Sequence, residues 1–134
     1  MKKLLLLAAL LCAFAAHAAF DLSSAKPTLL IPPTTIAANA TNTVEFASAG
    51  RKGTGMVYVA ATSSATNGTI AVALLTTNLV AGGWSTFAAA TYPTYPTNAV
   101  YQLPVAVEYL SPVNRFSIAP AGGSTTASAV LLSY

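Results

Sequence analysis

Residues 67–75, Asn-Gly-Thr-Ile-Ala-Val-Ala-Leu-Leu, carry the pattern that decides the fold. Ile70, Val72 and Leu74 alternate with alanines, so one side of this segment is large and apolar and the other is small. Successive side chains of a β-strand point to opposite faces of its sheet, and this alternation is typical of a strand that packs one face on a core. The Asn-Gly pair is a turn signal, because glycine tolerates the positive φ of a tight connection. The segment therefore predicts a strand that follows a tight turn.

Seven further runs of this kind follow one another at intervals of about 10 to 14 residues, a spacing typical of a sandwich or a barrel. They cover residues 28–31, 43–47, 55–61, 85–90, 101–110, 115–118 and 128–133, the fifth of which is either bent at Pro104 or divided into two strands. No segment after residue 18 is long enough and has the helical period. The sequence therefore predicts an all-β protein, an antiparallel β-sandwich of the jelly-roll or Ig-like type.

The first eighteen residues have the three parts of a secretory signal peptide. Lys2 and Lys3 form a positive start, residues 4–16 are an uninterrupted apolar run, and Ala-His-Ala at 16–18 is a cleavage pattern. A membrane-spanning helix needs about 20 apolar residues, and this run is shorter. Lipidation at Cys12 would need a small residue before the cysteine, where a leucine stands. We expect cleavage after Ala18 and a protein that is secreted, periplasmic or on the cell surface, with no transmembrane helix in the mature chain.

Cleavage changes the charge of the chain. The formal net charge falls from +3 to +1, because Lys2 and Lys3 leave with the signal. The only neighbouring cations that remain are Arg51 and Lys52, and a nucleic-acid site needs a larger basic surface. We therefore expect no nucleic-acid partner.

Cleavage also removes the single cysteine and the single histidine, Cys12 and His17. A disulfide, a Cys or His metal ligand, a cysteine nucleophile and a Ser–His–Asp arrangement are then excluded. Glu45 and Glu108 could in principle form a glycosidase pair, but both alternate with apolar neighbours as solvent-facing charges do. We expect no enzymatic activity, no cofactor and no metal.

The segment between the signal and the main strand pattern contains three prolines. Proline cannot donate a ladder hydrogen bond, so residues 19–35 are expected to form an extended arm or an edge strand before a sandwich domain at 36–134. Leu29, Leu30 and Ile31 form its apolar centre. As an arm, they could add a strand to the sheet of a neighbouring subunit. The alternative is that they form the first strand of their own sandwich.

Three aromatic residues are candidates for contact with a ligand. Residues 92–97 repeat Tyr-Pro-Thr, and the prolines would hold Tyr92 and Tyr95 in an extended course that costs little entropy on binding. Trp84 follows two glycines and could stack on a sugar ring or a partner protein. The alternatives are a rigid connector whose tyrosines fold back on the sandwich, and a tryptophan that packs in the core or at its rim.

The composition favours association. Only 7% of the residues are charged and 54% are hydrophobic, whereas about a quarter of the residues of a typical soluble domain are charged. A surface with few charges has little electrostatic repulsion between copies. We therefore expect self-association, unless the many Thr, Ser and Asn residues hydrate the surface sufficiently.

Residues 53–134 resemble small β-sandwich proteins encoded among phage and prophage structural genes. The matching features are Gly53-x-Gly55, Ile70-x-Val72-x-Leu74 with Thr77-Asn78 and Trp84 after it, Arg115-Phe116-x-Ile118, Gly122-Gly123-Ser124, and the closing Ser128-x-Val130-Leu131-Leu132. The resemblance implies a virion or assembly component. The sequence thus predicts an exported, non-enzymatic structural protein that self-assembles. The alternative is a secreted adhesion module that binds a glycan or a protein through an exposed Trp/Tyr loop.

Overall fold

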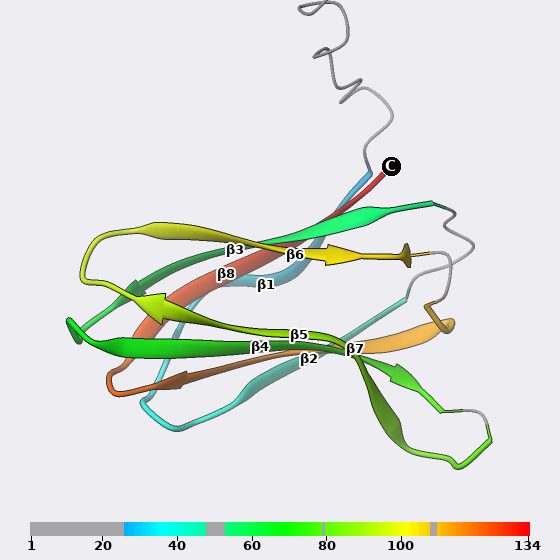
Figure 1. The fold of residues 1–134 in the computed structure, drawn as a ribbon, viewed down its shortest axis with the longest axis horizontal. Coiled ribbons are helices and arrows are strands. Elements are labelled where there is room, and N and C mark those ends of the chain that lie inside the picture. Colours follow the sequence, from blue (N-terminus) through cyan, green and yellow to red (C-terminus); the bar gives the residue numbers. More distant parts are fainter. Residues whose placement is uncertain (1–25, 48–52, 79, 108–109) are drawn as a thin grey trace, which may run out of the picture.

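A computed structural model describes residues 26–47, 53–78, 80–107 and 110–134 of the 134-residue chain. The expected signal peptide at 1–18, residues 19–25 of the expected arm, and Glu108 lie outside the described residues. Within that part the elements are eight strands (Figure 1): β1 (Lys26–Ile36), β2 (Asn42–Ala47), β3 (Gly55–Ser63), β4 (Gly68–Thr77), β5 (Trp84–Thr94), β6 (Ala99–Val105), β7 (Val113–Ala121) and β8 (Thr125–Ser133). No helix in the described ranges is long and apolar enough to cross a membrane.

The strands form two four-stranded sheets. The first sheet has the order β1-β8-β3-β6 and the second has the order β2-β7-β4-β5, and all the neighbouring strands are antiparallel. The two sheets lie as separate layers in Figure 1. Eight strands in this arrangement are a jelly roll. The predicted antiparallel β-sandwich is confirmed, and of its two expected types the jelly roll is the one that forms.

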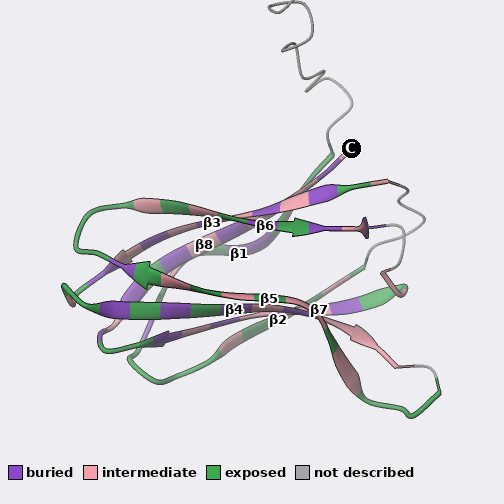
Figure 2. Ribbon diagram, in the orientation of Figure 1, coloured by how far each residue is buried: buried purple, intermediate pink, exposed green. Residues whose placement is uncertain are grey.

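The core lies between the two sheets. Val57 and Val59 of the first sheet and Phe116 and Ile118 of the second belong to it, and all four are inaccessible to solvent. The alternation of large and small side chains in β4 places Ile70, Val72 and Leu74 in the same core. Figure 2 shows this as buried and less buried residues that alternate along the strands. Burial of each large side chain contributes about 1.5–3 kcal/mol to stability, so a sandwich without a disulfide has a substantial core.

The proline-containing segment is the first strand of the sandwich. β1 pairs with β8 at the edge of the first sheet, with register shifts between Leu29 and Ile31 and between Ile31 and Thr34. The prolines at 32 and 33 lie within the second shift, where no regular ladder is required. The expected boundary at residue 35 therefore lies inside β1, and residues 26–36 belong to the sandwich rather than to a separate arm.

Each predicted run differs from the observed strand at one end or both, and β5 and β6 show why. β5 extends beyond the predicted 85–90 and includes the first Tyr-Pro-Thr copy up to Thr94, because its edge position tolerates Pro93. β6 begins at Ala99 and ends at Val105, so the predicted strand over 101–110 is too long. Val107 is nevertheless buried, and its carbonyl oxygen accepts a hydrogen bond from the Leu110 amide in a turn.

Candidate ligand-binding face on the second sheet

The outer face of the second sheet carries an ordered group of charged and aromatic side chains. Glu45 of β2 and Arg115 of β7 are directly paired across the sheet, and Arg115 Nη2 donates a hydrogen bond of 2.5 Å to Glu45 Oε1. The Arg115 guanidinium carbon also lies 4.1 Å from the centre of the Trp84 ring. A cation over an aromatic face is attracted by the ring quadrupole. The ion pair and the cation–π contact thus hold one line of side chains, Glu45–Arg115–Trp84, across this face.

A glycine-containing hairpin places Trp84 at the start of β5. Asn78 Oδ1 accepts hydrogen bonds from the amides of Val80 and Ala81, and Asn78 Nδ2 donates one to Ser85 Oγ. Gly82 and Gly83 then have φ of 72° and 77°, and an added Cβ on either would meet no atom within 4 Å. The requirement for glycine is therefore conformational. The turn fixes the point at which Trp84 enters the strand.

A shallow trough of about 290 Å³ lies next to this line on the same face. Ala73 of β4 is at its centre, paired with Ser117 on one side and Ala89 on the other. The next row, formed by Ala119, Ala71 and Thr91, lies two residues further along the strands, about 7 Å away. The floor is therefore made of methyl groups, and the hydroxyl groups of Ser117 and Thr91 lie on its two sides. Arg115 contacts Trp84 and lies two residues before Ser117 on the same face. The Glu45–Arg115–Trp84 line is therefore next to the trough.

Tyr92 has a structural role in the described structure. Its ring stacks on that of Tyr101 in β6, with 4.6 Å between the ring centres and 13° between their planes. The Tyr92 hydroxyl donates a hydrogen bond of 2.7 Å to the Gln102 carbonyl oxygen, and the Tyr101 hydroxyl donates one to the Pro93 carbonyl oxygen. β5 and β6 belong to different sheets. The stacked pair therefore joins the two sheets at one edge and is not an exposed contact surface.

Tyr95 is exposed, but it is far from Trp84. It lies in the connection between β5 and β6, and its carbonyl oxygen accepts a hydrogen bond from the Ser63 amide. Trp84 and Tyr95 are at opposite ends of β5, so about 35 Å of strand separates them. The expected single Trp/Tyr loop is thereby corrected: the structure brings Trp84 together with Arg115 and Glu45, which sequence reasoning did not connect to it.

The three residues of the expected assembly arm lie on different sides of β1. Leu30 and Ile31 are buried in the core, whereas Leu29 points outward. Both buried side chains belong to the same hydrophobic cluster as Val57 and Phe116. A segment that completes its own sheet in this way is not available as a donor strand unless the sandwich opens.

The tyrosine pair gives a prediction for alkaline pH. Burial raises the pKa of Tyr92 and of Tyr101, and the charge of Tyr95 raises the pKa of Tyr101 further. A raised pKa means that the folded protein holds these protons more tightly, so their contribution to stability is present below about pH 10 and is lost as the pH rises through the folded-state pKa values. We expect the melting temperature to fall above about pH 10. The fall should be smaller in the Tyr92→Phe/Tyr101→Phe variant. Tyr95→Phe should retain most of it, because burial is the larger cause of the Tyr101 shift and the charge of Tyr95 is the smaller one.

Within the described ranges, no three His, Cys, Asp or Glu residues lie together as potential metal ligands. The described carboxylate on the outer face of the second sheet, Glu45, is engaged by Arg115. The arrangement can provide an aromatic ring, a charged pair and hydroxyl groups around a flat apolar floor. These are groups for holding a ligand.

Comparison with known proteins supports the fold. No protein-family model matches the sequence, and no curated protein does so significantly. Among solved structures, the SPBc2 prophage-derived protein YomS has a TM-score of 0.50 and 10% identity, with 82% of this chain and 94% of that chain covered. A carbohydrate-binding module described as CBM4 has a TM-score of 0.48 and 15% identity over 81% of this chain and 66% of that chain, so this chain spans just under two thirds of its length. A structure of infectious bursal disease virus, Gx strain, has a TM-score of 0.42 and 13% identity, covering 81% of this chain and 30% of that chain. The expected likeness to prophage proteins thus holds for the fold of one such protein, and the chain is a two-sheet antiparallel β-sandwich.

Proposed function

We propose that this protein is an exported, non-catalytic β-sandwich that binds a saccharide chain on the outer face of its second sheet. The observation that carries the proposal is the position of Trp84, which Arg115 holds on the same face as a trough floored by alanine methyl groups, with the row of Leu75 between them. A pyranose ring has an apolar C–H face and a rim of hydroxyl groups. The C–H face fits an aromatic ring or a methyl floor, and the hydroxyl groups fit Ser, Thr, Glu and Arg.

The shape of the trough favours a saccharide over a protein as the ligand. Binding sites on proteins for partner proteins usually receive large apolar anchors in deep pockets. Here the side chains of the floor are the smallest available, and the hollow is wide and open. A volume of about 290 Å³ is close to the lower end of the range for ligand pockets, about 300–1,000 Å³. One or two sugar rings lying flat would occupy it, and a longer chain would continue across the open face.

The alternative of assembly through a donor arm has less support. A donor strand must leave its own sheet, but β1 is paired with β8 along most of its length and contributes Leu30 and Ile31 to the core. Export is proposed on the signal-like residues 1–18, and the absence of catalytic activity on the lack of Cys and His after residue 18. Both proposals are compatible with a surface module that binds a neutral polymer.

Native affinity electrophoresis of the exported form in gels that contain neutral polysaccharides tests this function. We expect at least one polysaccharide to retard the protein, and the retardation to be lost in Ala73→Phe, where a ring fills the centre of the trough. Tyr95→Ala is the matched control, because it changes an exposed aromatic residue at the far end of β5. A folded protein that migrates unchanged with all the polysaccharides would refute the proposal.

A further inference from the structure

The outer face of the first sheet is apolar over one half and has no role in the proposed saccharide site. Two neighbouring rows cross all four strands there, Pro27–Leu132–Met56–Pro104 and Leu29–Val130–Tyr58–Gln102. The adjacent row adds Val100 on β6 opposite Ala60. Leu29 and Val100 are 61% and 59% exposed. Leu29 and Val100 thus lie exposed on the two edge strands, and partly exposed side chains of β8 and β3 lie between them on the same face.

Among the residues that the structure describes, no charged side chain interrupts this face. The outward positions of the four strands carry aliphatic, aromatic, proline, hydroxyl, thioether and amide groups, and Lys26 lies on the inward row opposite Ser133. The outer face of the second sheet, by contrast, carries the Glu45–Arg115 pair. Two copies of the uncharged face can therefore approach each other without repulsion and without leaving a charge unpaired.

The two edge strands of the first sheet, unlike its outer face, are protected against association with another chain. β1 carries Pro27, Pro32 and Pro33, and β6 carries Pro104. Prolines on edge strands discourage pairing with another chain, as is common in sheets that remain unpaired at their edges. Association of this protein is thus directed away from strand addition and toward the face.

We propose that two copies of this chain pack through the outer faces of their first sheets to form a symmetric dimer. Strands of nine residues at about 3.4 Å per residue, and four strands about 4.8 Å apart, give a face of about 30 Å by 19 Å, or about 570 Å² in projection. The accessible area of protruding side chains is larger than the projection. A stable interface buries about 800 Å² on each partner. The whole face, its apolar half and its hydroxyl-bearing half together, therefore approaches the size that a dimer requires.

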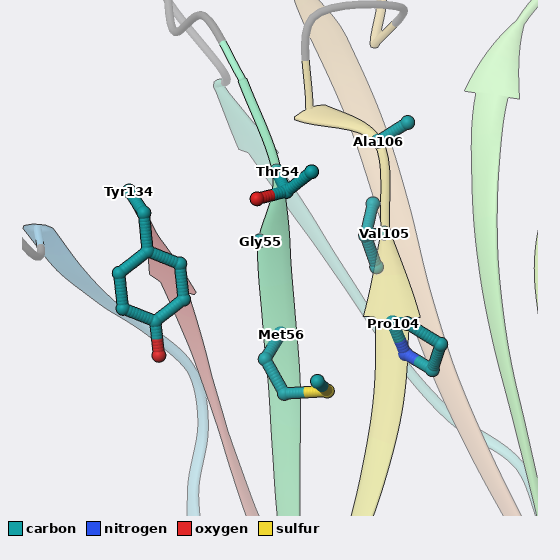
Figure 3. Close-up of a pocket in the computed structure, with 7 residues that line it drawn as sticks. All are labelled: Thr54, Gly55, Met56, Pro104, Val105, Ala106 and Tyr134. Carbon is teal, nitrogen blue, oxygen red and sulfur yellow. The ribbon is translucent and has the colours of Figure 1, made fainter. Parts of the chain in front are cut away.

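A hollow at one end of this face gives the dimer a specific contact. It has a volume of about 400 Å³ and is lined by Met56, Pro104 and Tyr134, among others. Figure 3 shows the Met56 side chain between Tyr134 and Pro104. A hydrogen bond with Tyr58 positions Tyr134 and raises its pKa. An apolar side chain of the second copy fills this hollow, as an anchor residue does at the centre of an interface.

Packing of the first sheets leaves both second sheets facing outward. The dimer then presents two copies of the Glu45–Arg115–Trp84 line on opposite sides. A polymeric ligand with repeated units can engage both, and linked binding events raise the overall avidity without any new contact. The dimer itself does not depend on the saccharide proposal.

Val100→Glu and Val113→Glu test the dimer as a matched pair. Both valines are exposed, at 59% and 44%, but Val100 lies on the outer face of the first sheet and Val113 on β7 of the second. By sedimentation velocity over a range of concentrations, we expect the unmodified protein and Val113→Glu to form dimers. Val100→Glu should weaken dimerisation by about a hundredfold or more, because a carboxylate would be buried without a partner. Circular dichroism should show that all three are folded.

Two outcomes would overturn the proposal. One is an unmodified protein that stays monomeric at every concentration, including a monomer that instead binds neutral phospholipid vesicles through the same face. The other is a dimer that is equally strong in both variants, since the interface would then lie elsewhere. Neither outcome affects the saccharide test, which uses variants of the second sheet.

Discussion

Replacement of Leu30 by alanine is expected to lower the free energy of unfolding by about 2–5 kcal/mol, whereas the same change at the neighbouring Leu29 should alter it by about 0.5 kcal/mol or less. Leu30 is 2% exposed and Leu29 is 61% exposed, although both lie on β1. Truncation of a buried leucine removes its transfer free energy and leaves a cavity among residues that cannot fully collapse. Truncation of an exposed leucine leaves no cavity, and no neighbouring side chain loses its packing partner in the core.

Urea unfolding followed by circular dichroism measures the difference, at a concentration low enough to keep the protein monomeric. The pair of variants also tests the donor-strand hypothesis. If residues 26–36 served mainly to bind a neighbouring subunit, Leu30→Ala would reduce association and leave the stability of the monomer intact. Equal stability of the two variants would therefore remove β1 from the core and return the donor strand to consideration.

The strand pattern could be predicted because it depends on residues close together in the chain. The alternation of Ile70, Val72 and Leu74 with alanines identifies both a strand and its inward face. Seven of the eight predicted runs lie wholly within observed strands, and the run at 101–110 continues beyond the end of β6. The ends were less predictable. Prolines usually end strands, yet β5 continues through Pro93 because it is an edge strand with one unpaired side. Edge position is a property of the sheet order, which no local pattern contains.

The candidate site depends on pairing between strands and was therefore only partly predictable. Trp84 was identified as a candidate, but its contact with Arg115 requires β5 and β7 to be placed in one sheet on either side of β4. Glu45 and Arg115 are 70 residues apart in the chain and meet only through the β2–β7 register. A possible signal was the alanines at 71, 73, 89 and 119, which lie on strands and leave room on their outward side.

Tyr92 and Tyr95 show the same limit in another way. The repeated Tyr-Pro-Thr motif makes the two tyrosines equivalent in sequence, but the first copy ends a strand and the second forms a connection. Tyr92 consequently stacks on Tyr101 between the sheets, while Tyr95 remains exposed. The two tyrosines differ because β5 ends between them, at Thr94. Where β5 ends depends on its long-range pairing with β4, in which Gly68 is the partner of Thr94.

Replacement of Trp84 by alanine is expected to remove most of the retardation in the gel assay, a loss of at least about thirtyfold in affinity, because an aromatic anchor residue of a binding site contributes about 2 kcal/mol or more. The ring is half-buried against Arg115 rather than enclosed in the core. Its removal should therefore leave the sandwich folded, with a melting temperature only modestly lower. Isothermal titration calorimetry with the polysaccharide that gives the strongest retardation measures the affinity.

Two further variants test whether the ligand needs an aromatic ring at position 84 and whether that ring must be held by Arg115. Trp84→Phe retains an aromatic face and should recover part of the affinity, whereas Arg115→Gln removes the guanidinium that holds the ring and should weaken binding less than Trp84→Ala. Tyr95→Ala should bind as the unmodified protein does, because about 35 Å of strand lies between the two aromatic residues. If Tyr95→Ala loses binding and Trp84→Ala does not, the ligand lies at the β5–β6 connection, and the trough on the second sheet is not the site.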